Sequence, residues 1–550
     1  MSLLGLTSLL EALPEYKRFS ADLLSDGARL KAQILPQGIP YFVSSLCEES
    51  GGPILLMVPT GEDARNLYEE ISLWNCEKDR ILYFPESETV PYERLTVDMG
   101  AIHQRIQTLS KLIISDPSNI LVIGSVAAIC QKTIERHFFD ENVYLLKKDQ
   151  HFEPTNLMKT WLKMGYIRRP NVDEPGIVSL RGGILDIFPP NSHAPVRLEF
   201  WGDTVDSIRL FDLDTQISTG FINSVTIVPA RETLPGLLEE DAINQCLNTI
   251  DMSDCVDTAS ARITEELEML RDGLQIEDLD FYAGFFNRGS LFDYLGPDGA
   301  IITIRPESIA EAADAIGKRV NDLKYAKEQH SELPKNFPSP LFTWDEVEQK
   351  SNQIRRRLSI GSWGANDLTG RDQHLFPFTV APDFRGNLDL FAEQISTFVA
   401  DGHRVVAVSS VPNRLGEILT ENDLNFDFGE AVDTMPAAGS INVIQLRGSG
   451  LSQGFVLTVD GTQLFVLSDS EIFGISKQHR SIRPRSVKLN SILDELISGD
   501  FVVHVEHGIG RFLGMERRPS DEGGHEYLII EYAKGDQLYV PVDHLDRVAP

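Results

Sequence analysis

Few residues of this chain have the types and spacing that carry chemistry, and the first ones to consider are those of a phosphate-binding loop. A nucleotide site of the G-x-x-x-x-G-K-[ST] type needs a tight glycine turn, a lysine for the phosphates and a hydroxyl for magnesium. The sole Gly-Lys pair is Gly317-Lys318, and Arg319 stands where that hydroxyl is required. The sequence therefore predicts no ATP hydrolysis by these residues and no bound cofactor.

Two further polar pairs are weighed as metal or catalytic groups. Asp345-Glu346 does not follow an apolar strand, so we interpret it as acids that favour the start of a helix. His504 and His507 are three residues apart, and in a strand this spacing directs their side chains to opposite faces. Neither pair is predicted to bind a metal, and no catalytic residue is predicted.

Two charged groups of residues leave alternatives open. Residues 477–488 hold five Lys/Arg and no acid, which fits either an extended tether or a local contact with phosphate. The second group is a strand face that is either solvated or a polar protein interface. Its basic members are Arg168, Arg169, Arg181 and Arg197, and its acids, which we expect to be exposed, are Asp186, Glu199, Asp203 and Asp206.

The composition bounds what these groups can do. The 550 residues are enough for several domains, and 42% hydrophobic residues support packed cores. Fifty Lys+Arg against 82 Asp+Glu give a net charge of −32, which argues against one continuous nucleic-acid surface. No apolar run is long enough to span a bilayer, and five scattered cysteines predict no disulfide framework. We expect a cytoplasmic protein with no membrane partner.

The elements that position these groups begin with an α/β layer. Apolar runs at 53–59, 81–85 and 120–125 each precede an amphipathic stretch, which predicts parallel strands followed by helices near 61–74 and 98–113. A further apolar run at 300–304 predicts a strand that continues this sheet.

From about residue 151 the pattern changes to a β-rich module. A helix at 157–166 is followed by short strands, and VRLEFW alternates so that Val196, Leu198 and Phe200 share one face while Arg197, Glu199 and Trp201 share the other. This alternation is typical of a half-buried antiparallel strand.

The remaining segments complete the expected organisation. A helix is predicted at 344–358, and a second α/β domain from about 375, in which Asp460-Gly461 alternatively closes a hairpin. The glycine-punctuated strands after residue 496 predict a small curved β-barrel. In it, Gly508 and Gly510 are expected at a bulge or tight bend where a side chain would clash.

Three stretches together resemble one family, the bacterial transcription-repair coupling factors (the Mfd family). GYIRRPNVDEPGIVSLRGGILDIFPP, which runs on through VRLEFWGDTVDSIRLFDLDTQIS, resembles the module that these factors share with the excision-repair protein UvrB. VVHVEHGIGRFLGM and EYLIIEYAKGDQLYVPVDHLDRV resemble their RNA polymerase-interacting domain, which also occurs in CarD-type regulators. PESETVPYERL at 85–95 fits the same family.

The resemblance implies a multidomain α/β and α+β fold. It comprises a degenerate P-loop-like α/β layer with an inserted β-rich module, a second small α/β domain and a C-terminal Tudor-like β-barrel. The implied ranges are 1–150 and 236–345 for the UvrB-like layer, 151–235 for the inserted module, 346–374 for a linker helix, 375–475 for the small α/β domain, 476–495 for a basic linker and short helix, and 496–550 for the polymerase-interacting domain.

The resemblance also implies partners and contact residues. The UvrA-binding candidates are Arg181, Phe188 and Arg168. RNA polymerase, through its β subunit, is expected to bind by strand addition at Ile509–Met515 and Tyr527–Tyr532, with Ile509, Arg511, Phe512, Met515, Tyr527, Ile529 and Tyr532 as candidates. An ATP- and magnesium-dependent motor that binds double-stranded DNA is expected beyond residue 550.

The sequence thus predicts a factor that recognises polymerase stalled at DNA damage and recruits the excision-repair machinery. Two alternatives remain at this point. A UvrB-like ATP-dependent excision subunit would need a phosphate loop. A CarD-like regulator of initiation would leave residues 150–215 without a role.

Overall fold

The computed structural model describes residues 3–549, apart from 26, 75–77, 88–89, 95–97, 117, 239–242, 246–248, 362–372, 446–449, 475–498, 505–507, 519–524, 533–536 and 542–547. The chain forms two compact units, Met1–Lys477 and Gln478–Pro550. The basic segment 477–488 and the short helix predicted after it lie outside the described residues. No described helix is long and apolar enough to cross a membrane.

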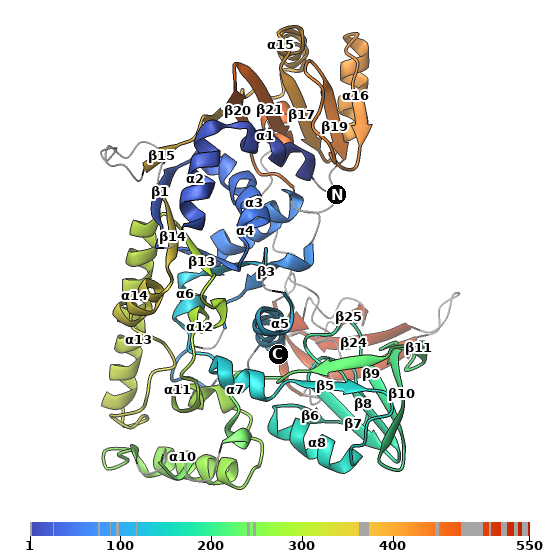
Figure 1. Cartoon of the computed structure of the whole chain (residues 1–550). Coiled ribbons are helices and arrows are strands. Elements are labelled where there is room, and N and C mark those ends of the chain that lie inside the picture. Colours follow the sequence, from blue (N-terminus) through green and yellow to red (C-terminus); the bar gives the residue numbers. More distant parts are fainter. Residues whose placement is uncertain are drawn as a thin grey trace. The chain divides into compact units, whose positions relative to one another are not determined.

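The first unit is built on a parallel sheet in the order β15-β1-β14-β13-β2-β4-β3 (Figure 1). All of its strand pairs are parallel, as the apolar runs predicted. The strands are β1 (Arg29–Gln33), β2 (Ile54–Val58), β3 (Ile81–Phe84), β4 (Leu121–Ser125), β13 (Ala300–Ile304), β14 (Arg356–Gly361) and β15 (Gln373–Leu375).

Helices cover both faces of this sheet. One face packs on α3 (Ile39–Glu49) and α4 (Gly61–Trp74), together with the N-terminal helices α1 (Thr7–Ala12) and α2 (Pro14–Leu24). The opposite face packs on α5 (Met99–Ile114), α6 (Val126–Cys130), α7 (Arg136–Glu141), α12 (Phe292–Leu295) and α13 (Pro306–Gln329). Because β13 pairs with β2, the sheet continues after the insertion, as predicted.

The helix predicted at 344–358 is shorter than expected. Helix α14 spans Trp344–Gln353 and begins with a capping box in which Thr343 and Glu346 exchange hydrogen bonds. The chain then enters strand β14, so the prediction for residues 354–358 was wrong. Leu358 and Ile360 alternate with more exposed residues between β1 and β13, and burial there outweighs the local helical preference.

The inserted module is a six-stranded sheet, β11-β10-β9-β8-β7-β6, packed on α8 (Pro154–Lys163). Its strands are β6 (Ile167–Arg168), β7 (Ile177–Arg181), β8 (Ile184–Ile187), β9 (Val196–Trp201), β10 (Thr204–Phe211) and β11 (Ser218–Phe221). The module leaves and rejoins the layer through a stalk, formed by β5 (Tyr144–Lys147) paired antiparallel with β12 (Ser224–Ile227).

A helical segment follows the module. It contains α10 (Asp257–Arg271) and α11 (Ala283–Phe286), and its small core includes Ile263, Tyr282 and Phe337. This core lies beside the loop after β3, because Tyr92 of that loop belongs to it.

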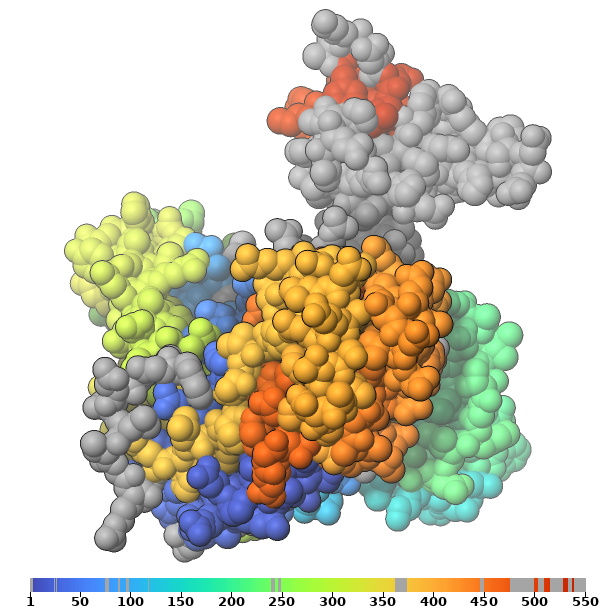
Figure 2. Space-filling view, turned by 90° about the horizontal axis from the view of Figure 1, so that it is seen from above, coloured from blue at the N-terminus to red at the C-terminus, as the bar shows by residue number. Residues whose placement is uncertain are grey.

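A second sheet, β16-β20-β21-β17-β19-β18, completes the first unit. Asp460 and Gly461 both have positive φ and close the β20–β21 hairpin, which confirms the hairpin alternative. One face shares a core with α1 and α3, and these segments lie side by side in Figure 2 (orange and blue). The elements are β16 (Phe378–Val380), α15 (Leu388–Ala400), β17 (Arg404–Ser409), α16 (Pro412–Glu421), β18 (Asp427–Gly429), β19 (Ile441–Gln445), β20 (Phe455–Val459), β21 (Thr462–Ser468) and α17 (Asp469–Phe473).

The second unit is an antiparallel sheet in the order β25-β24-β23-β22-β26. Its small core contains Val502, Phe512, Leu528 and Ile530. The strands are β22 (Phe501–His504), β23 (Gly508–Arg518), β24 (His525–Glu531), β25 (Gln537–Pro541) and β26 (Val548–Ala549).

Candidate functional site

One face of the inserted sheet carries a row of charged and aromatic side chains, which we call the charged face. The strand register aligns Asp186 with Arg197, Arg197 with Arg209, and Arg209 with Phe221. Residues that are directly opposite on neighbouring strands share a face. Arg181, Glu199 and Trp201 alternate with the core-facing residues and lie on the same face.

Asp186 organises this face. Its carboxylate accepts hydrogen bonds from Arg181 Nη2 at 2.6 Å, from Arg197 Nε at 2.7 Å and from Arg197 Nη2 at 3.0 Å. The expectation of an exposed acid was wrong, because Asp186 is 1% exposed and the two guanidinium groups take the place of water around it. The hydrogen bonds to Asp186 raise the pKa of Arg197.

Arg181 is held by this contact but stays accessible. Its side chain is 49% exposed, and it lies at the end of β7 beside a turn in which Gly182 has a φ of +61°. With one guanidinium nitrogen bound to Asp186, the orientation of the group is fixed while its outer edge faces solvent. A preordered arginine of this kind suits recognition of a carboxylate on a partner.

Trp201 and Phe221 extend the charged face and were missed as site residues. Their exposed fractions are 85% and 74%. Arg209 stacks 4.7 Å from the Phe221 ring centroid and donates to Glu199 at 2.8 Å. The alternation of VRLEFW already placed Trp201 on this face, and a large aromatic there was the available signal for a protein interface.

The structure does not bring the other two UvrA candidates together with Arg181. Phe188 is 5% exposed and packs with Val172, Ile177 and Phe211 in a small core. Arg168 is exposed on edge strand β6, but it pairs with Val178, which points into the core on the side of α8. Arg168 therefore lies on the opposite face from Arg181.

The second unit places the polymerase candidates on two neighbouring strands. Ile509 is 68% exposed and Arg511 is also exposed, next to Phe501, which is 72% exposed. Phe512 is in the core, and Ile529 and Tyr532 are half-buried. In the strand register, Met515 of β23 lies opposite Leu528, and Tyr527 of β24 lies opposite Glu516.

The register of this sheet limits where a strand can be added. β24 is paired along its length with β23 and β25. β22 reaches only residues 508–511 of β23, and backbone hydrogen bonds from Gly499 and to Asp500 extend this pairing to Phe512. Among the described residues, 513–518 therefore have a strand on one side only.

The prediction that a side chain would clash at the glycines of β23 is confirmed for Gly510. A Cβ atom on Gly510 would lie 2.3 Å from Ile530 Cγ2, so a side chain there would clash. The bulge itself lies between Phe512 and Gly514, and Gly514 has a φ of +144°.

The start of α4, where a nucleotide-binding protein of this architecture would hold phosphate, is occupied by carboxylates. Glu86 lies beside Gly61, because a Cβ there would be 2.9 Å from Glu86 Oε1. Asp63, in the first turn, accepts from Thr60 at 2.8 Å and pairs with Arg305 at 2.7 Å. These acids would repel a phosphate, so the residues present do not fit ATP.

Comparisons with known proteins identify both modules. Residues 145–232 match the family model for the UvrB interaction domain, and residues 496–550 match that for the CarD-like/TRCF RID domain. Curated relatives named Transcription-repair-coupling factor include proteins of Myxococcus xanthus (28% identity), Bacillus subtilis (27%) and Escherichia coli (26%). The matches cover 85%, 92% and 98% of this chain, but 40%, 44% and 46% of those relatives.

These matches confirm the resemblance drawn from the sequence, and the chain spans less than half the length of these relatives. The two alternatives, an excision subunit and an initiation regulator, are not favoured, because the coupling-factor relatives match across both modules.

Proposed function

We propose that this chain acts in transcription-coupled DNA repair, where it binds RNA polymerase stalled at a lesion and recruits UvrA. The observation that carries the proposal is the presence of a UvrB interaction domain and a CarD-like/TRCF RID domain in one chain. The first module would bring the repair machinery and the second would hold the polymerase.

Several finer points belong to the same proposal. The polymerase contact is with the β subunit, and the second unit is a Tudor-like barrel. The parallel layer derives from a P-loop fold, and the protein works in the cytoplasm. ATP, magnesium and most of the contact with double-stranded DNA belong to the family's motor rather than to these residues; the carboxylates at the start of α4 support this division.

UvrA would bind the charged face through Arg181 on β7, with Trp201 on β9 and Phe221 on β11 farther along the same face. Arg181→Ala is expected to weaken UvrA binding by about 1–3 kcal/mol, because it removes a charged hydrogen-bond donor from the interface. Calorimetric titration of the whole chain with UvrA measures this change. Arg271→Ala, which removes an arginine that pairs with its neighbour Asp272 outside the module, is the matched control.

Two further variants separate the faces of the module. Trp201→Ala is expected to weaken UvrA binding about tenfold or more, since exposed aromatics dominate interface energies. Arg168→Ala lies on the other face and should have the smaller effect. A strong loss with Arg168→Ala and none with Arg181→Ala would move the interface away from the charged face.

For polymerase, strand addition is proposed along residues 513–518 of β23, with Ile509, Arg511 and Phe501 beside it. Ile509→Asp should reduce the amount of polymerase that co-purifies with the tagged chain, because it puts a charge into an apolar contact. Val380→Asp changes an equally exposed aliphatic residue of the first unit and serves as control. Equal recovery of polymerase with both variants would remove Ile509 from the interface.

A further inference from the structure

A cavity of about 450 Å³ lies in the first unit, away from the charged face. Its walls come from the loop after β3, from Arg105 on α5, from Glu232 just beyond the stalk, from residues 278–287 and from α13. The volume is within the range of small-molecule sites. Neither the proposed function nor the polymerase candidates use it.

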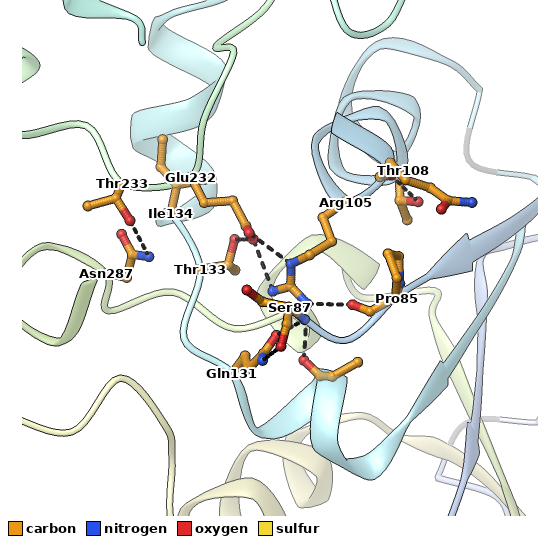
Figure 3. Close-up of polar contacts among 12 residues, drawn as sticks. Pro85, Ser87, Arg105, Thr108, Gln131, Thr133, Ile134, Glu232, Thr233 and Asn287 are labelled. Atoms are coloured by element: carbon orange, nitrogen blue, oxygen red, sulfur yellow. Dashed lines mark hydrogen bonds and ion pairs between the residues drawn. The ribbon is translucent and has the colours of Figure 1, made fainter. Parts of the chain in front are cut away.

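One wall of the cavity is a preformed polar network (Figure 3). Arg105, which is 1% exposed, donates from Nε to Glu232 Oε2 at 2.8 Å and from Nη2 to Glu232 Oε1 at 3.0 Å. It also donates to the carbonyl oxygen of Pro85 at 3.0 Å. Thr133 donates to Glu232 Oε1 at 2.5 Å. The polar groups of this wall form hydrogen bonds with one another, so this side of the cavity has a fixed shape.

The adjoining part of the wall contains two hydrogen-bond acceptors to which no described residue donates. Thr233 Oγ1 donates to Asp280 Oδ1 at 3.2 Å, so it can only accept from Asn287, whose Nδ2 lies 3.2 Å away. This fixes the orientation of the amide. Asn287 Oδ1, in a residue that is 3% exposed, then has no hydrogen-bond partner among the described residues. Asp280 Oδ2 is likewise buried, and no described residue donates to it.

Five carboxylates and four basic side chains line the cavity, an excess of one negative charge. Burial raises the pKa of Asp280, an effect that Arg231 and Arg105 oppose and Glu232 reinforces. Glu93 also lines the cavity.

The basic residues of the lining are largely engaged elsewhere. Arg94 pairs with Glu266 at 2.6 Å, and Lys132 donates to the Ser339 carbonyl at 2.9 Å. Arg105 is held by Glu232, and Arg319 is exposed at the rim. A positively charged donor is therefore the group that the inner wall lacks.

We propose that this cavity binds a small organic cation of the amine or guanidinium class, which donates hydrogen bonds to Asp280 Oδ2 and Asn287 Oδ1, with Glu93 as a further acid of the lining. Tyr92 and Phe281 supply an aromatic part of the lining that suits the apolar portion of such a ligand.

Agmatine, which has a guanidinium at one end and an ammonium at the other, is the probe for the test. Calorimetric titration of the 550-residue chain should show saturable binding of one molecule. Asp280→Asn is expected to raise the dissociation constant about tenfold, because it removes a charged hydrogen-bond acceptor. Glu93→Gln, at another acid of the lining, should raise it severalfold and keeps the test valid if Asp280→Asn disturbs folding.

Asp314→Asn, an exposed acid-to-amide change on α13 outside the lining, should leave the affinity unchanged and is the control. Inorganic phosphate should not bind at this cavity. The proposal is overturned if agmatine gives no saturable signal with the unaltered chain, if Glu93→Gln binds it as tightly as Asp314→Asn does, or if phosphate competes for the same site.

Discussion

At the scale of single residues, Asp186 shows how much a charged side chain can depend on its neighbours. Spacing predicted a solvated acid on a strand face. The structure instead buries it between Arg181 and Arg197, and the Arg197 guanidinium lies 4.7 Å from the ring centroid of Phe211. The alternation of the sequence set the face correctly, but the pairing depends on a register that no local pattern encodes.

The Asp186→Asn substitution is expected to destabilise the module. It would leave the Arg197 guanidinium, 15% exposed, without its counter-charge, at a cost of about 3 kcal/mol. Urea unfolding followed by tryptophan fluorescence, to which Trp161 in the module core contributes, measures the change. Asp206→Asn, an exposed acid on the same sheet, should leave the midpoint in place. An unaltered midpoint for Asp186→Asn would show that the arginines need no buried partner.

His103 on α5 should make the fold sensitive to acid. Its pKa is lowered from 6.5 to about 4, chiefly by burial and to a smaller extent by the charge of Arg231, while Asp98 opposes the shift. The unfolded chain therefore binds this proton more readily, so the contribution to stability is complete above pH 6.5 and is lost as the pH falls toward 4, by about 3 kcal/mol.

The thermal midpoint of the unaltered chain, measured between pH 7 and pH 4.5, should fall further than that of His103→Gln. Parallel curves for the two proteins would assign the acid sensitivity to other groups. The cause is local, since a Cβ atom on Gly176 would lie 2.9 Å from His103 Nε2 and leaves little room for water around the ring.

At the scale of elements, the sequence predicted what local patterns determine. β2, β4 and β13 are continuous apolar runs and were predicted, whereas β1, with the sequence RLKAQ, was not. Only Leu30 and Ala32 of β1 are buried, and its place between β14 and β15 is set by the sheet. The same holds for β14, which was predicted as the end of a helix.

The candidate site was predictable to a similar extent. Arg181 and the face it occupies followed from motif and alternation. The burial of Phe188 did not, because it depends on Val172 and Phe211, which are distant in sequence and close it off from solvent. The cavity beside Asp280 unites seven separate segments and has no local sequence signal.

A pair of glycine substitutions tests the packing of the second unit. Gly510→Ala should destabilise it by about 1–3 kcal/mol, since the new methyl group would press on Ile530. Gly317→Ala, in the middle of α13 with open space around it, should instead stabilise its helix by up to about 1 kcal/mol. Differential scanning calorimetry of the whole chain reports both. A stable Gly510→Ala variant would mean that β23 and β24 can move apart.

At the scale of the whole molecule, the net charge of −32 governs encounters with polyanions. Fluorescence anisotropy with a short DNA duplex at about 0.15 M salt should give a dissociation constant weaker than roughly 100 μM. Changing Arg480, Arg483 and Arg485 to glutamine tests the basic segment. Tight binding that these changes abolish would favour the phosphate-contact interpretation of residues 477–488 over the tether.

Because the inserted module is joined to the layer by a two-stranded stalk, it can be replaced as one unit. Tyr144 and Ile227 face each other across one strand pair, so the chain exits and returns at points about 5 Å apart. Replacing residues 145–226 with a tight turn would shorten a hairpin rather than break a sheet. A lineage could therefore exchange one binding partner for another by swapping this insert, while the layer beneath it kept its strand order.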